Sequence, residues 1–119
     1  MNTILKPASA FGLAAALLLV ATQASAHAHL LTSTPAKDAS VAAPKQLALS
    51  FSETLEPKFS GIELTKADGA KVETTATIAG KAINATPKAA LAPGAYKVMW
   101  HAVSADGHRT KGDYAFSVK

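Results

Sequence analysis

Leu91-Ala92-Pro93-Gly94-Ala95-Tyr96-Lys97-Val98-Met99-Trp100 is the segment of the sequence that is most diagnostic of the fold. After the Pro-Gly turn, Tyr96, Val98 and Trp100 alternate with more polar neighbours, which is the period of a strand with one buried face. A tyrosine three residues after a turn proline is also typical of a tyrosine corner, in which the hydroxyl bonds back to the turn before its strand. Both features predict an antiparallel β-sandwich, with Tyr96 and Trp100 in structural roles.

The same alternation continues on both sides of this stretch. Apolar residues recur at every second position in two further segments: Leu47, Leu49 and Phe51, and Tyr114, Phe116 and Val118. Turn-forming Pro, Asp-Gly and Ala-Gly pairs separate about seven such segments, and no helical stripe follows the first 26 residues. The chain is therefore expected to be all-β, a single sandwich or barrel of short strands.

The first 26 residues have the composition of a secretory signal peptide. Lys6 precedes an apolar run over residues 10–21, and Ala24-Ser25-Ala26 provides small residues for cleavage. The run is about a dozen residues, short of the roughly 20 that span a bilayer, so cleavage is favoured over a retained anchor. We expect residues 1–26 to be removed and residues 27–119 to form one exported, periplasmic domain.

Composition excludes several classes of function. The chain of 119 residues has a formal net charge of +4 and no cysteine. Its lysines are spread along the sequence without an aromatic-basic stripe, which argues against nucleic-acid binding. Without thiolates, any metal site must use nitrogen, oxygen or thioether ligands.

Two segments carry candidate metal ligands. Cleavage after Ala26 would give His27 a free α-amine, and this amine and the imidazole could chelate one ion through two nitrogens, a donor set that copper(II) favours. Asp106-Gly107-His108 lies between two strand patterns, and its carboxylate and imidazole are also plausible copper(II) ligands. The alternative for this tripeptide is an ordinary Asp-Gly hairpin turn. The two segments can cooperate only if they meet at the same end of the sandwich.

With these segments, the sequence resembles a known family, the small periplasmic copper-binding proteins of the CopC type. The resemblance spans residues 27–119 and rests on an ordered set of segments. These are His27-Ala28-His29-Leu30, Ser33-Thr34-Pro35-Ala36, Leu49-Ser50-Phe51-Ser52-Glu53, Phe59-Ser60-Gly61, the stretch from Leu91 to Trp100, and Val103-Ser104-Ala105-Asp106-Gly107-His108. The family fold is a seven-stranded Greek-key β-sandwich or barrel with an immunoglobulin-like appearance, in agreement with the strand pattern.

The resemblance implies a ligand set for one copper(II) ion. It would consist of the α-amine and imidazole of His27, the carboxylate of Asp106 and the imidazole of His108. Glu53 matches an acidic family position near this site, where we expect an electrostatic role or that of a solvated strand-end carboxylate.

A copper(I) site is not expected. Some family members carry a methionine-rich loop at the other end of the barrel, but the corresponding residues 64–71 contain neither methionine nor histidine. Met99 is the only methionine after the leader, and one thioether cannot build a soft site. Met99 and His101 share one side of a strand and are expected to lie on its partly exposed face.

His29 leaves a second mode of copper binding open. In a mature start of His-Ala-His, the amine, two deprotonated backbone amides and the third-position imidazole could form a square-planar copper(II) site without Asp106 or His108. Strand alternation places His27 and His29 on the same side, so His29 could also act as a hydrogen-bonding neighbour. We favour the folded site because a scaffold that preorganises its ligands avoids ordering costs.

The function expected from these observations is copper homeostasis or resistance. A monomeric periplasmic protein would capture or deliver copper(II), with a CopD-type inner-membrane transporter as the partner that the resemblance suggests, and would not be an enzyme. One alternative is a histidine-brace copper monooxygenase, but Asp106 and the scarcity of aromatic residues argue against it. The other is a metal-free interaction module, whose folding stability copper would leave unchanged.

Overall fold

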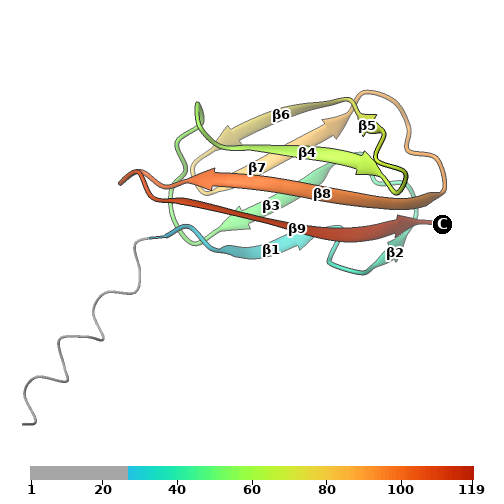
Figure 1. Ribbon diagram of the computed structural model, residues 1–119, viewed down its shortest axis with the longest axis horizontal. Coiled ribbons are helices and arrows are strands. Elements are labelled where there is room, and N and C mark those ends of the chain that lie inside the picture. The colour runs from blue at the N-terminus through green and yellow to red at the C-terminus, as the bar shows by residue number, and fades with distance from the viewer. Residues whose placement is uncertain (1–26) are drawn as a thin grey trace, which may run out of the picture.

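The computed structural model describes residues 27–119, which form nine strands in two sheets (Figure 1). The predicted signal peptide, residues 1–26, lies outside the described residues. The strands are β1 (Leu30–Thr34), β2 (Ser40–Val41), β3 (Leu47–Phe51), β4 (Gly61–Lys66), β5 (Lys71–Val72), β6 (Thr74–Ala79), β7 (Ala82–Pro87), β8 (Gly94–Val103) and β9 (Arg109–Val118). Residues 27–119 include no helix long and apolar enough to cross a membrane.

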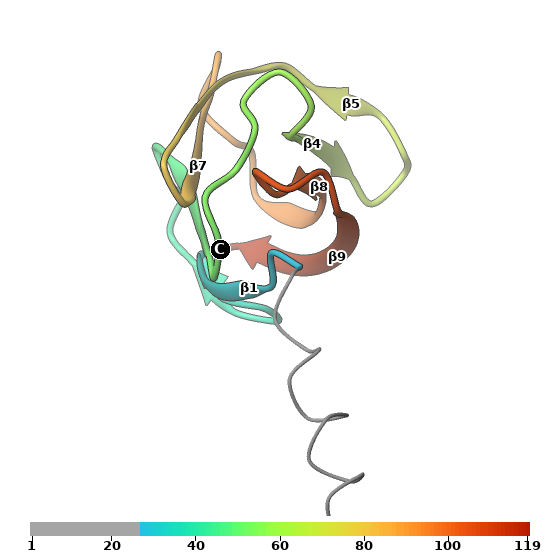
Figure 2. The ribbon, with the colours of Figure 1, turned by 90° about the vertical axis from the view of Figure 1, so that its left-hand side faces the viewer.

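The two sheets face each other as the layers of a sandwich (Figures 1 and 2). One has the order β1-β3-β7-β6 and the other the order β2-β9-β8-β4-β5. All pairings are antiparallel except that of the short β2 with β9. The all-β class and the two-layer architecture predicted from the sequence are confirmed.

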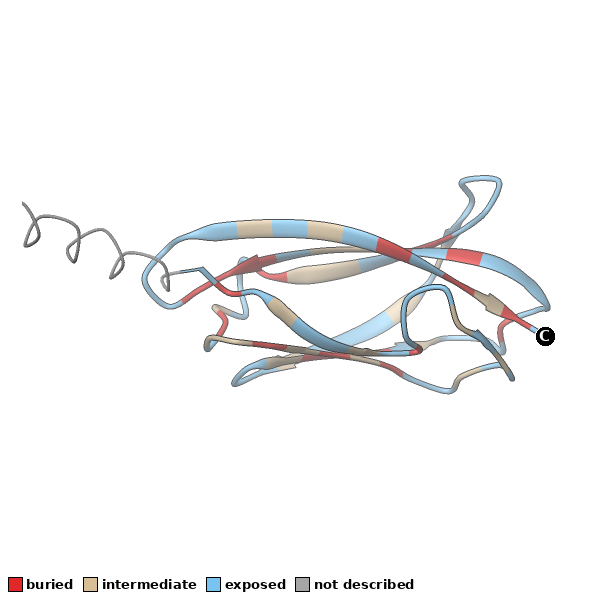
Figure 3. Cartoon of the chain, turned by 90° about the horizontal axis from the view of Figure 1, so that it is seen from below, coloured by how far each residue is buried: buried red, intermediate tan, exposed pale blue. Residues whose placement is uncertain are grey.

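The core lies between the sheets, and buried positions alternate with exposed ones along the long strands (Figure 3). In β3, Leu47, Leu49 and Phe51 are buried, as the alternation predicts. Tyr114, Phe116 and Val118 of β9 are buried in the same way. Burial of these side chains, at about 1.5–3 kcal/mol for each large apolar residue, is the main force that holds the layers together.

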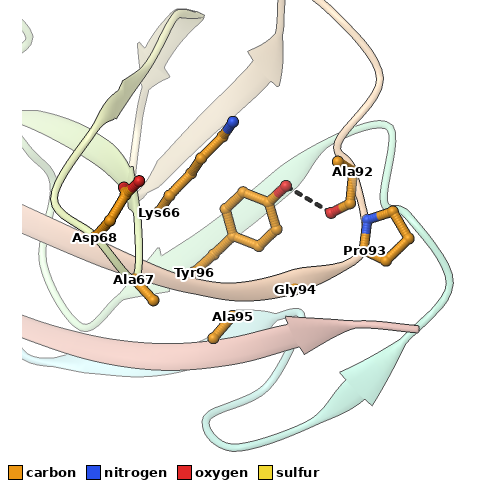
Figure 4. A pocket seen from close by; sticks show the side chains of 8 residues that line it. All are labelled: Lys66, Ala67, Asp68, Ala92, Pro93, Gly94, Ala95 and Tyr96. Carbon is orange, nitrogen blue, oxygen red and sulfur yellow. Dashed lines mark hydrogen bonds between the residues drawn. The ribbon is translucent and has the colours of Figure 1, made fainter.

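The predicted tyrosine corner is present at the start of β8. The Tyr96 hydroxyl donates to the Ala92 carbonyl at 2.6 Å across the turn (Figure 4). Gly94 has a positive φ of 142°, which residues with a side chain rarely adopt. The Tyr96 ring stacks on Phe116 of β9, with centroids 5.5 Å apart, so the corner ties the turn to the core.

The strand count differs from the predicted seven because the described residues include two strands of only two residues, β2 and β5. The run from Val72 to Ile78, expected as one strand, is divided at Glu73. Val72 pairs with β4 in the five-stranded sheet, whereas β6 pairs with β7 in the other. The chain therefore crosses between layers at Glu73, which composition alone does not reveal.

Candidate metal centre

The first described residues are held between the ends of two strands. Ala28 is fully buried (0% exposed) and belongs to the core, while His27 and His29 on either side of it are exposed. The Ala28 carbonyl accepts a hydrogen bond from Thr110 Oγ1 of β9 at 2.8 Å. Ser52, directly after β3, holds the other side: its Oγ accepts from the His29 amide at 2.8 Å and donates to the His27 carbonyl at 3.3 Å. The segment that carries both histidines is thus fixed to both sheets.

The β8–β9 hairpin carries the second group of candidate ligands. The Gly107 amide bonds to the Ser104 carbonyl at 2.8 Å, and the Ser104 amide bonds to the His108 carbonyl at 2.9 Å. Gly107 adopts a φ of 91°, which suits glycine, so the Asp-Gly turn predicted from the sequence is present. Asp106 and His108 project from this turn, each with about half of its side chain exposed (50% and 51%).

These two segments meet at one end of the sandwich, where Figure 2 shows the start of β1 beside the β8–β9 hairpin. The imidazole centroids of His27 and His108 lie 4.7 Å apart. Asp106 Oδ2 lies 3.0 Å from His108 Nδ1. The fold therefore brings together His27, Asp106 and His108, which the resemblance implies as ligands.

Hydrogen bonds keep Asp106 in its ionised form. The Ser104 hydroxyl donates to Asp106 Oδ1, and the side chain and the backbone amide of His108 also bond to this carboxylate. In that order of importance, these bonds lower the pKa of Asp106 from 3.8 to about 2. The site thus holds a carboxylate with its full negative charge at neutral pH, which favours a cation.

The cluster is not yet arranged around one point. Among residues 27–119, no group of three histidine or acidic side chains surrounds a common position suitable for a metal ion. His108 Nδ1 instead forms its bond to Asp106, and the α-amine of His27 exists only after cleavage. Asp106 and His108 are half exposed, so their side chains have room to rotate.

The other two candidates are placed differently. The His29 ring lies 6.4 Å from that of His27, on the same exposed side as predicted. Glu53 is partly exposed, and no hydrogen bond or ion pair joins it to the histidine cluster in the described part of the chain.

Three residues of the site were not singled out by sequence reasoning: Ser52, Ser104 and Thr110. Their hydroxyls position the candidate ligands through hydrogen bonds to Asp106 and to the backbone of residues 27–29. Serine and threonine in strands and turns are common, so their type alone gives no indication of this role. Only Ser104, two residues before Asp106, could have been proposed as a local hydrogen-bond donor.

Within residues 27–119, no comparable group of histidine and acidic side chains lies at the opposite end of the sandwich. A shallow pocket there, at the tyrosine corner, is lined by Lys66, Ala67, Asp68, Ala92, Pro93, Gly94, Ala95 and Tyr96 (Figure 4). None of these eight residues is a histidine or a methionine. Met99 is partly buried and His101 exposed on β8, the partly exposed strand face predicted for them.

Comparison with known proteins places this geometry in a family. The family model described as the CopC domain matches residues 30–119. Protein YobA of Escherichia coli (strain K12) is 46% identical over 102 residues, covering 79% of this chain and 80% of that protein. Copper resistance protein C of Escherichia coli is 42% identical over 110 residues, covering 84% and 87%. The crystal structure of PcoC, a methionine-rich copper resistance protein from Escherichia coli, matches with a TM-score of 0.74 at 39% identity, covering 79% of this chain and 100% of that one.

The chain therefore belongs to the CopC family, as the resemblance indicated. Proteins of this family are copper-binding resistance proteins and not enzymes, which confirms the prediction of a non-enzymatic protein. The monooxygenase alternative is set aside on the same ground.

Proposed function

We propose that this protein is a periplasmic copper-binding protein that contributes to copper resistance by holding a single copper(II) ion. Its ligands are the α-amine and imidazole of His27, the Asp106 carboxylate and the His108 imidazole. The observation that carries this proposal is the 4.7 Å separation of the His27 and His108 rings, which come from opposite ends of the mature chain. A mixed nitrogen and oxygen donor set of this kind suits copper(II).

Removal of residues 1–26 by signal peptidase is part of the proposal. Cleavage after Ala26 creates the α-amine at the one residue whose imidazole already lies beside His108. Because Ala28 is buried and its carbonyl is bonded to Thr110, the new terminus would remain at the site. Processing and completion of the metal site are then the same event.

Copper is a cargo in this proposal, because the protein would capture it and pass it on. Half-exposed ligands at the end of a sandwich are accessible to a receiving protein, and a CopD-type inner-membrane transporter is the partner we propose. The protein would act as a monomer and use no methionine site for copper(I). Met99 is the only methionine among residues 27–119, and one thioether is too few for a soft copper(I) site, which supports that last point.

The test is a copper(II) titration of two chains, one starting at His27 and one with a single glycine ahead of His27. The added residue removes the α-amine from its position but leaves both imidazoles and Asp106 in place. We expect at least a tenfold loss of affinity in the extended chain, because two of four donors form one chelate. Equal affinities would show that the terminus is not a ligand.

A further inference from the structure

Hydrogen bonds fix the backbone around His29, and this restricts how copper can bind. The His29 amide donates to Ser52 Oγ at 2.8 Å, and the His29 carbonyl accepts from the Ser52 amide at 2.9 Å. One residue earlier, the Ala28 carbonyl is bonded to Thr110 Oγ1, and Ala28 itself is 0% exposed. We call Ser52 and Thr110, with these bonds, the terminal clamp.

A chain that begins His-Ala-His has a competing way to hold copper(II). The α-amine, the backbone nitrogens of Ala28 and His29, and the His29 imidazole can surround the ion in one plane. In this local mode both amides lose their protons and face the metal. It needs neither Asp106 nor His108, so in a flexible peptide nothing would prevent it.

The terminal clamp opposes this local mode. To bind copper, the His29 nitrogen must leave Ser52 Oγ, and the backbone of Ala28 must turn away from Thr110 and out of the core. Each step abandons a hydrogen bond, and the second also exposes a buried residue. The folded ligand set requires none of these changes, because His27 and His108 are already neighbours.

We infer that Ser52 and Thr110 are specificity-determining residues that select the coordination mode by withholding the backbone nitrogens from copper. This inference rests on the proposed copper(II) function. Two hydroxyl side chains that do not contact the ion would thus decide whether copper binds in the folded ligand set or in the local mode. The folded ligand set uses no deprotonated amide, so it can release copper without reprotonating backbone nitrogens, which suits a protein that delivers its cargo.

The test uses chains starting at His27, in two backgrounds. In the His108→Ala background the folded site is disabled, and copper must use the local mode against the clamp. Adding Ser52→Ala should then raise copper(II) affinity, by on the order of tenfold for one abandoned hydrogen bond. In the otherwise unchanged chain, Ser52→Ala should leave affinity equal or lower it. A gain of affinity in the His108→Ala background without a gain in the otherwise unchanged chain cannot arise from a general loss of stability.

The visible absorption spectrum of bound copper(II) gives a readout of the coordination mode that is independent of affinity. Deprotonated amide nitrogens are strong-field ligands, so the visible copper(II) band of Ser52→Ala/Thr110→Val should shift to shorter wavelength, and adding His29→Ala should abolish the shift. Ser52→Thr, which keeps a hydroxyl, should retain the original band. Ser50→Ala is the matched control, because Ser50 lies in β3 two residues before Ser52 and its hydroxyl bonds to Thr32, not to the histidine segment.

Three outcomes would contradict the inference. One is that His29→Ala shifts the visible copper(II) band of the otherwise unchanged chain. Another is a Ser52→Ala/Thr110→Val variant that folds and whose visible copper(II) band is unchanged. If Thr110→Val prevents folding, the band of the Ser52→Ala single variant is used instead. The third is failure of Ser52→Ala to raise affinity in the His108→Ala background. A chain that binds no copper in any form would refute the proposed function as well, which separates the two failures.

Discussion

At the scale of single residues, Asp106 shows how hydrogen bonds keep a candidate ligand ionised. Its low pKa of about 2 arises first from the Ser104 hydroxyl and then from the side chain and amide of His108. Because the folded-state pKa is depressed, the stabilisation from these bonds is complete above the ordinary value of 3.8 and is lost as the pH falls through about 2. Asp106 is half exposed, so its contribution to stability is small.

This leads to a prediction about the pH dependence of copper binding. Protons compete with copper(II) for imidazole and amine nitrogens, so the copper(II) affinity should fall as the pH is lowered from about 8 to 5. Asp106 should add no inflection in that range, because it stays ionised down to about pH 2. Competitive titrations at several pH values would measure the slope. An affinity that does not change over this range would contradict the proposed nitrogen ligands.

At the scale of elements, the strands were readily predicted because burial on one face produces period two in the sequence. Leu47, Leu49 and Phe51 of β3 have this pattern and are buried, and the corner at Tyr96 follows from a local turn. The two-residue strands were not predicted, since two residues cannot show a period. Ser52 and Thr110 were missed for a different reason: their partners are backbone atoms 23 to 82 residues away.

Two glycines in the five-stranded sheet allow a matched test of packing. Gly112 lies opposite Trp100, and an added Cβ would lie 2.7 Å from the Trp100 ring, which packs edge-on against Phe51 with centroids 5.1 Å apart. Gly61 lies opposite His101, whose exposed imidazole would be 2.8 Å away and can swing into solvent. The two sites thus differ in the freedom of the neighbouring ring.

Gly112→Ala should therefore destabilise the domain by about 1–3 kcal/mol, because the ring between the sheets cannot move aside. Gly61→Ala should change stability by no more than about 0.5 kcal/mol. Urea unfolding of both variants, compared with the parent chain, would measure the difference. Similar losses at the two sites would show that the rings are equally free or equally fixed.

At the scale of the whole molecule, the sandwich places its candidate site at one end, where the start of the described chain lies beside the β8–β9 hairpin (Figure 2). The sequence motifs suggested the ligands, but the separation of His27 and His108 depends on how two sheets pack. No local pattern encodes that distance. The bond between Asp106 and His108 was also not predicted, since it depends on a side-chain arrangement within the turn.

Copper should stabilise the processed domain if the folded state alone holds it. Free copper(II) at a hundredfold excess over Kd adds about 2.7 kcal/mol. For a domain of this size the melting temperature should then rise by about 10 to 20 °C. Thermal unfolding followed by circular dichroism would measure the rise, with the glycine-extended chain as control. A similar rise in the extended chain, or none in the processed one, would argue against a site built on the terminus.

The bond between Ala28 and Thr110 joins residues 82 positions apart in the chain. Such a contact forms only when the long intervening loop is closed, and this closure costs conformational entropy. His27 and His108 come together only when both sheets have assembled, so a nascent or unfolded chain cannot present the folded ligand set and offers copper only the local mode. Topology thus sets an order of events for the proposed site: folding must come first, and the folded ligand set can receive copper only in the assembled domain.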